Sequence, residues 1–168
     1  VEKPEEKHLF EDPLYFWENV NGQFQAVPEI ESGLRDNREG RGLLTFDYDR
    51  DGDLDVFIVN NGDSPVLFTN NLNDSSSNAW LQLKFEGTRS NTQGIGARVE
   101  VIPDPGQQPR IYELTGHSHF LGQSEAMIHV GLGGHAGAVH EFRVHWPSGI
   151  TQVFNDVATR SEERRVGK

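Results

Sequence analysis

The chain has 168 residues, of which 35% are hydrophobic, and carries a formal net charge of −11 with a pI near 5.0. This composition supports one ordinary domain, or a small domain plus part of another. The acidic balance argues against a nucleic-acid binder, which needs a basic face to contact phosphates, and it favours a cation as partner. Because the chain has no cysteine, it has neither a disulfide framework nor a thiolate metal site, although this does not fix the compartment.

The first 13 residues are mostly polar, and we expect residues 1–13 to form an N-terminal extension that can reach a neighbouring molecule. Val1 opens a stretch without a signal-peptide pattern, and no apolar run approaches the roughly 20 residues that span a bilayer. We therefore expect no membrane insertion and interpret the chain as a mature product or an excised piece.

Short apolar runs rich in β-branched and aromatic residues recur between Gly, Pro, Asn and Asp clusters, which is typical of an all-β protein. Apolar and polar residues alternate most clearly in "WLQLKF" and "ARVEVI", which indicates strands of antiparallel sheets with one wet face. Strands are expected at residues 14–20, 23–27, 42–46, 54–60, 66–69, 80–86, 97–102, 110–115, 126–130, 141–146 and 150–154.

An acidic loop, "DYDRDGDLD" at residues 47–55, carries five aspartates and one arginine and runs directly into an apolar strand. Its carboxylates repel one another unless a cation binds them. The pattern D-x-D-x-D-G-x-x-D supplies only oxygen ligands around a turn at Gly52, and a flexible loop with six or seven such ligands favours calcium over magnesium. The predicted ligands are the side-chain oxygens of Asp47, Asp49, Asp51 and Asp55 and the backbone carbonyl of Asp53.

An EF-hand begins with the same spacing but needs a bidentate Glu at its twelfth position and a helix on each side. Here that position is Ile58, within an apolar strand, so a calcium loop between β-strands is favoured over an EF-hand. The alternative is a solvated Asp-rich turn without an ion, which the match in both spacing and glycine disfavours.

The stretch around the acidic loop, "GRGLLTFDYDRDGDLDVFIVNNGDSPVLFTNN", resembles an FG-GAP or VCBS repeat, the calcium-binding blade unit of integrin-α-type β-propellers. The upstream "LYFWENVNGQFQAVPEIESGL" resembles the end of a preceding unit, so we assign residues 14–71 to this repeat region. Propellers close with about four to eight blades, and one complete calcium loop cannot close one. We therefore expect the chain to be either the C-terminal end of a longer protein or a subunit whose free strand edges pair with another chain.

Residues 72–79 are almost entirely Asn, Ser and Asp, and we interpret them as a linker. Asn73 begins an Asn-Asp-Ser triplet that fits an N-glycosylation acceptor, a weak signal that matters only in a eukaryotic secretory context.

Residues 80–157 resemble the ASPIC/UnbV domain, through "WLQLKFEGTRSNTQGIGARVEVI", "GHSHFLGQSEAMIHVGLG" and "FRVHWPSGITQVFNDV". This domain follows FG-GAP-type repeats in many secreted proteins. The resemblance implies an extracellular or periplasmic calcium-binding protein, and it supplies no catalytic residues to carry over.

Three other patterns partly match known catalytic, metal-binding or nucleotide-binding motifs. "GHSHF" at residues 116–120 suggests a nucleophile elbow at Ser118, but Phe120 replaces the required glycine and a strand follows where a helix is needed. His117 and His119 alternate and could bind a metal, although no third ligand lies nearby in the sequence. "GLGGHA" fits a dinucleotide-binding pattern without the helix that such a site requires, and a tight turn is favoured.

Trp80 and Trp146 are predicted to pack in the core, with an exposed carbohydrate-stacking pair as the alternative. Asp63 is either a further calcium ligand or a turn residue. Residues 158–168 are expected to form a disordered tail, because the strand pattern is lost in the last eight residues, and a non-native extension is left open as an alternative.

The sequence thus predicts an all-β fold, in which a partial propeller-type blade with a calcium loop precedes a C-terminal antiparallel β-sandwich or barrel-like domain. We expect a non-catalytic, extracellular or periplasmic calcium-binding structural or adhesion module. Its predicted partner is a second copy of itself, in an oligomer or filament, or another extracellular protein or a glycan, and not nucleic acid. A carbohydrate-recognition module is the first alternative, and a serine hydrolase acting through Ser118 is the second.

Overall fold

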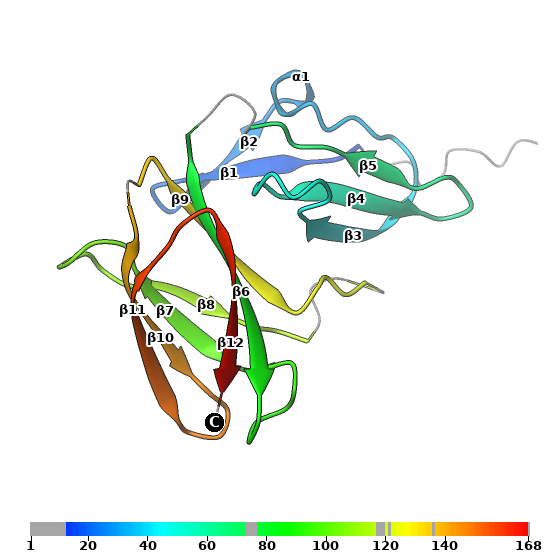
Figure 1. Cartoon of the computed structure of the whole chain (residues 1–168). Helices are drawn as coiled ribbons and strands as arrows, with labels where there is room; N and C mark the ends of the chain where they lie inside the picture. Colours follow the sequence, from blue (N-terminus) through cyan, green and yellow to red (C-terminus); the bar gives the residue numbers. More distant parts are fainter. Residues whose placement is uncertain (1–12, 73–76, 117–119, 121, 136, 168) are drawn as a thin grey trace, which may run out of the picture.

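The computed structural model describes residues 13–167, except 73–76, 117–119, 121 and 136, and for residues 161–167 it describes the backbone alone. The regular secondary structure of the described chain is almost entirely β-strand, which confirms the predicted all-β fold (Figure 1). A single turn of helix, α1 (Glu29–Ser32), was not expected from the sequence and ends at Gly33 in a left-handed conformation.

The N-terminal part, residues 13–72, begins with a hairpin of β1 (Phe16–Val20) and β2 (Gln23–Val27). Asn21 and Gly22 connect these strands with φ values of 53° and 84°. Two positive φ angles in a two-residue loop match the type I′ turn, whose twist suits a hairpin. The Asn-Gly pair therefore explains why the chain reverses here.

A three-stranded antiparallel sheet follows, in the order β3-β4-β5. It consists of β3 (Gly40–Phe46), β4 (Asp55–Asn60) and β5 (Val66–Phe68). The register places Phe46 opposite Asp55, so the acidic loop connects two paired strands. This pairing sets the position at which every aspartate of the loop leaves the sheet.

The C-terminal sandwich contains two sheets with strand orders β12-β6-β9 and β11-β10-β7-β8 (Figure 1). The first sheet is built from β6 (Ala79–Gly87), β9 (Met127–Gly133) and β12 (Ser161–Gly167). The second is built from β7 (Arg98–Ile102), β8 (Arg110–Glu113), β10 (Val139–His145) and β11 (Thr151–Val157).

Alternation along the strands builds the core of the sandwich. Leu81, Leu83 and Phe85 of β6 are buried, and they form one cluster with Val99 and Val101 of β7 and with residues of β9 and β10. Side chains of one strand face alternate sides of a sheet, so the polar residues between these positions lie on the outer face. The alternation seen in the sequence therefore predicted which face of each sheet packs inwards.

The C-terminal residues differ from the sequence expectation. Residues 161–167 form β12, which pairs in parallel with β6 from Ser161 opposite Leu81 to Gly167 opposite Gly87. The highly charged segment "SEERRVG" lacks an apolar alternation, and it joins the sheet through backbone hydrogen bonds, which depend little on side-chain type. The sandwich is consequently not purely antiparallel.

Among the described residues, no helix has the length and apolar character that crossing a membrane requires.

Candidate cation site

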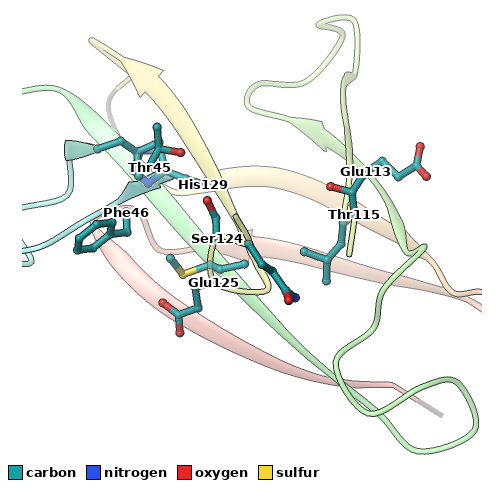
Figure 2. Close-up of a pocket in the computed structure, with 11 residues that line it drawn as sticks. Thr45, Phe46, Glu113, Thr115, Ser124, Glu125 and His129 are labelled. Atoms are coloured by element: carbon teal, nitrogen blue, oxygen red, sulfur yellow. The ribbon is translucent and has the colours of Figure 1, made fainter. Parts of the chain in front are cut away.

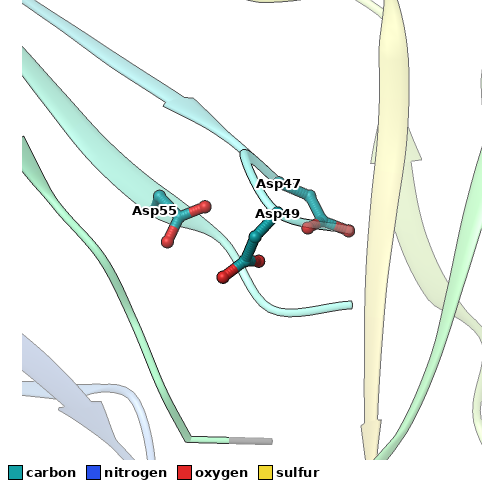
Figure 3. Close-up of side chains that lie close together, drawn as sticks. All are labelled: Asp47, Asp49 and Asp55. Atoms are coloured by element: carbon teal, nitrogen blue, oxygen red, sulfur yellow. The ribbon is translucent and has the colours of Figure 1, made fainter. Parts of the chain in front are cut away.

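The acidic loop brings three carboxylates together. Asp47 follows the last residue of β3, Asp49 lies within the loop, and Asp55 is the first residue of β4 (Figure 3). One ligand oxygen from each of these three residues lies within 4.8 Å of the others. The structure thus assembles three of the five predicted ligands from a stretch of nine residues.

Asp55 is a fully buried carboxylate held by two backbone donors. Its Oδ2 accepts a hydrogen bond of 2.6 Å from the Tyr48 N–H, and its Oδ1 accepts one of 2.8 Å from the Asn70 N–H. Hydrogen bonds of this kind stabilise an ionised carboxylate where water cannot reach it. Asp55 therefore ties the loop to the segment that follows β5.

Asp47 divides its two oxygens between different roles. Its Oδ2 accepts hydrogen bonds from Nε2 of Gln82, at 2.8 Å, and from the Gly52 N–H, at 3.2 Å. Its Oδ1 is buried and has no hydrogen-bond partner. A buried charged oxygen without a partner is costly, and it needs an explanation such as a bound ion or water.

Asp49 is the exposed member of the group. Partial desolvation within the loop and the neighbouring carboxylates of Asp51 and Asp55 raise its pKa. This direction means that the ion-free loop disfavours another negative charge at this position. A cation at the cluster would reverse that effect.

Asp51 and Asp53 are not part of the three-carboxylate group. Oδ1 of Asp51 accepts a hydrogen bond of 3.0 Å from the Asp53 N–H, which closes the turn around Gly52. Gly52 and Arg50 both have positive φ angles, of 95° and 65°. In the described geometry, Asp51 shapes the loop while Asp47, Asp49 and Asp55 face the common space.

The acidic loop lies against the outer face of the C-terminal sandwich, which the sequence did not indicate. Gln82 on β6 donates to Asp47, and a Cβ atom added at Gly52 would overlap with the indole of Trp80. Trp80 in turn stacks on His129 of β9, with ring centroids 6.4 Å apart. We call Trp80, Gln82 and His129 the platform.

Burial lowers the pKa of His129, against an opposing effect of the Asp47 carboxylate, so the ring is neutral at neutral pH. A neutral His129 ring adds no positive charge beside the loop, so it neither neutralises the carboxylates nor repels a metal ion. No sequence pattern identified the platform, because Gln82 has the place of an ordinary polar residue on the outer face of β6, and only the structure shows that it is 6% exposed.

A cavity of about 230 Å³ adjoins this junction and is lined by both parts of the chain (Figure 2). Thr45 and Phe46 contribute from the end of β3, and Ser124, Glu125 and His129 contribute from the segment leading into β9 and from β9 itself. The lining mixes apolar and polar groups and does not gather ligands of one chemical kind.

The other sequence candidates have different outcomes. Ser118, His117, His119 and Asn73 lie outside the described residues. Trp146 is 3% exposed and packs edge-on against Phe85, as predicted for a core residue.

Trp80 does not pack in the sandwich core, contrary to the prediction, and it is half-buried on the outer face of β6 because its place in the alternation is opposite to that of Leu81. Gly52 and His129 cover its indole, so Trp80 and Trp146 do not form the exposed pair that sugar stacking requires. Asp63 accepts a hydrogen bond from the Ser64 N–H in a turn and is not a member of the carboxylate group.

The fold and the site together define an all-β protein in which one carboxylate cluster lies on the outside of a β-sandwich. Residues 87–163 match the family model described as ASPIC and UnbV, from the end of β6 into β12. The chain therefore carries an ASPIC/UnbV domain, and the match extends into the segment expected to be a tail. The matched residues are less than half of the 168-residue chain. They do not include the acidic loop, so its resemblance to an FG-GAP or VCBS repeat stays a prediction. No match to a curated protein was found.

Proposed function

We propose that this chain is a non-catalytic calcium-binding structural or adhesion module, in which the acidic loop holds the ion. The observation that carries the proposal is the Asp47 carboxylate, one oxygen of which lies within 4.8 Å of ligand oxygens of Asp49 and Asp55, while its buried Oδ1 has no hydrogen-bond partner. Three carboxylates at this spacing repel one another at neutral pH unless a cation lies between them. The site is an acidic cluster that is completed by a positive charge.

The donor set fits a hard cation. All three groups offer oxygen, and each Asp55 oxygen that accepts a backbone hydrogen bond retains a second lone pair. Calcium accepts six to eight oxygens in flexible geometry, including carbonyls and water, whereas magnesium demands a near-ideal octahedron. The loop, built around a glycine turn with FG-GAP-like spacing, favours calcium. When bound, calcium would supply charge neutralisation and cross-linking of the loop.

An extracellular or periplasmic location is part of this proposal and is supported by the ASPIC/UnbV domain and the sequence resemblance to secreted repeat proteins. Extracellular calcium modules bind the ion with Kd values of about 10⁻⁴–10⁻³ M. An affinity in this range would suit a site that is constantly occupied outside the cell.

We extend the proposal to self-assembly through the N-terminal part. The β1–β2 hairpin forms a two-stranded sheet of its own; Trp17 and Phe24 on it are 54% and 70% exposed, and Tyr15, directly before β1, is 73% exposed. Large exposed apolar groups and free strand edges favour association with another chain. Light scattering after size-exclusion chromatography tests this, and a monomer at all concentrations with and without calcium would contradict self-assembly.

The test of the calcium site is a calorimetric titration of chelator-treated protein with calcium and, separately, with magnesium. We expect one calcium per chain, weaker magnesium binding, and a higher melting temperature in calcium. Asp49→Asn removes one ligand charge and should weaken calcium binding by about tenfold or more. The matched control is Asp104→Asn, a surface carboxylate in the turn after β7. Equal effects of the two changes, or no binding by the wild type, would contradict the proposal.

A further inference from the structure

The acidic loop belongs to the N-terminal part, but its position is fixed by side chains of the C-terminal sandwich. Leu81 and Leu83 of β6 point into the sandwich core and are fully buried. Gln82, between them, points to the opposite face, and it is still only 6% exposed. On that face Gln82 donates a hydrogen bond to Asp47 of the acidic loop. The loop therefore packs on the sheet and does not extend into solvent, an arrangement that we call the seated loop.

The hydrogen bond between Gln82 and Asp47 has a defined direction. Gln82 donates from Nε2 to Oδ2 of Asp47, and this leaves Oδ1 of the same carboxylate as the oxygen without a partner. A neutral amide fixes the orientation of the carboxylate without cancelling its charge. Outer partners of this kind orient metal ligands, and their loss typically costs about 10- to 100-fold in metal affinity.

Shape reinforces the same contact. Gly52 approaches the Trp80 indole so closely that any side chain at this position would overlap with the ring. Its φ of 95° also belongs to the region that favours glycine. The backbone of the loop at Gly52 thus packs directly against the Trp80 indole, while Gln82 supplies the hydrogen bond to the loop.

We propose that Gln82 is a positioning residue of the cation site and that calcium in the acidic loop fixes the N-terminal part to the C-terminal sandwich. This inference rests on the calcium site proposed above. Residues 47–55 carry a formal charge of −4, so the ion-free loop is under electrostatic stress. Calcium binds more tightly when Gln82 holds Asp47 in place. By linkage, bound calcium then favours the contact between the loop and the sheet by the same factor by which that contact raises the calcium affinity.

The experiment combines calcium titration with the indole N–H signals of the three tryptophans in a ¹⁵N-labelled full-length chain, assigned with Trp80→Phe and Trp17→Phe. In the wild type we expect the Trp80 signal to shift during titration with the same midpoint as the calorimetric binding curve. Gln82→Leu keeps the side-chain volume, and it should weaken calcium binding by about 10-fold or more. Gln107→Leu changes an exposed glutamine far from the loop in sequence and should leave the affinity unchanged.

Gln82→Asn guards against a folding defect, because it keeps the amide but shortens its reach to Asp47. We expect it to weaken binding as well. If the wild type binds calcium while the Trp80 signal does not move, or if both Gln82 variants bind calcium as tightly as the wild type, the coupling is wrong and the calcium site stands. If the wild type binds no calcium, both proposals fall together.

Discussion

The N-terminal part and the C-terminal sandwich are stabilised by different means. Sixteen buried apolar residues form the sandwich core, whereas Ile58 is the one buried hydrophobic residue among those described in the N-terminal part. Four of the five buried polar or charged residues among those described lie in the N-terminal part instead: Asp36, Asp53, Asp55 and Asn60. The sandwich depends on packed volume, while the N-terminal part depends on charges and hydrogen bonds. Ions and pH should therefore act mainly on the N-terminal part.

The largest expected loss of stability comes from a substitution in the core of the sandwich. Phe142 is fully buried and stacks on Phe154 with ring centroids 4.7 Å apart. Phe142→Ala should lower the free energy of unfolding by about 3–5 kcal/mol, because it removes apolar contacts and leaves a cavity. Urea unfolding followed by circular dichroism measures this.

The matched control is Phe24→Ala in the hairpin, where the ring is 70% exposed. It should change the stability of the monomer by less than about 0.5 kcal/mol. Similar losses for both variants would show that the N-terminal part is packed as tightly as the sandwich, contrary to the comparison.

An intermediate effect is expected where the two parts meet. Gly52→Ala introduces a Cβ atom into the Trp80 indole at a positive φ, and it should cost about 1–3 kcal/mol and reduce calcium binding. The control is Gly62→Ala, which has a positive φ of 70° and open space around it, so it should cost about 1 kcal/mol from the backbone alone. Thermal melts with and without calcium separate the two. Equal losses would mean that the loop is not seated on Trp80.

The smallest effect concerns pH and the N-terminal part alone. Burial opposes ionisation of Asp36, but hydrogen bonds from Arg38 and Asn60 outweigh it and lower the pKa. A lowered pKa in the folded state means that the ionised form stabilises the protein above the usual aspartate range near 3.9, and that this contribution disappears as the pH falls through the folded-state pKa.

Stability measured between pH 6 and pH 3 should therefore fall less steeply in Asp36→Asn than in the wild type. At pH 6 the substitution should cost about 1–2 kcal/mol, because the hydrogen bonds to a charged group are lost. Parallel pH profiles for the two proteins would contradict the role of Asp36. Asp104→Asn, which changes a surface carboxylate of the sandwich outside the N-terminal part, serves as the control.

Local patterns in the sequence were sufficient for much of the fold. The alternation of Leu81 and Leu83 with Gln82 placed one face of β6 in the core, and the strands expected at 14–20 and 23–27 left only Asn21 and Gly22 between them for the turn. Both features depend on neighbours in the sequence, where period and turn chemistry are informative.

The loop spacing likewise indicated the carboxylate cluster, because nine consecutive residues contain all of its members. It did not show that Asp51 bonds within the turn, since this depends on the φ angles of Arg50 and Gly52. Nor could it show that Gln82, 35 residues away from Asp47, completes the surroundings of the site. Contacts between distant segments of the chain leave no periodic signal.

The parallel pairing of β12 with β6 has a consequence for the order of folding. Ser161 pairs with Leu81 across a long stretch of sequence, whereas β6 and β9 join earlier along the chain. Pairing of such distant segments is slow, because the entropy of closing the intervening loop is lost before the contacts form. During synthesis, β6 therefore keeps one unpaired edge until residues 161–167 have left the ribosome. For this interval the nascent chain exposes a template for aggregation, which a chaperone or rapid completion of synthesis would have to protect.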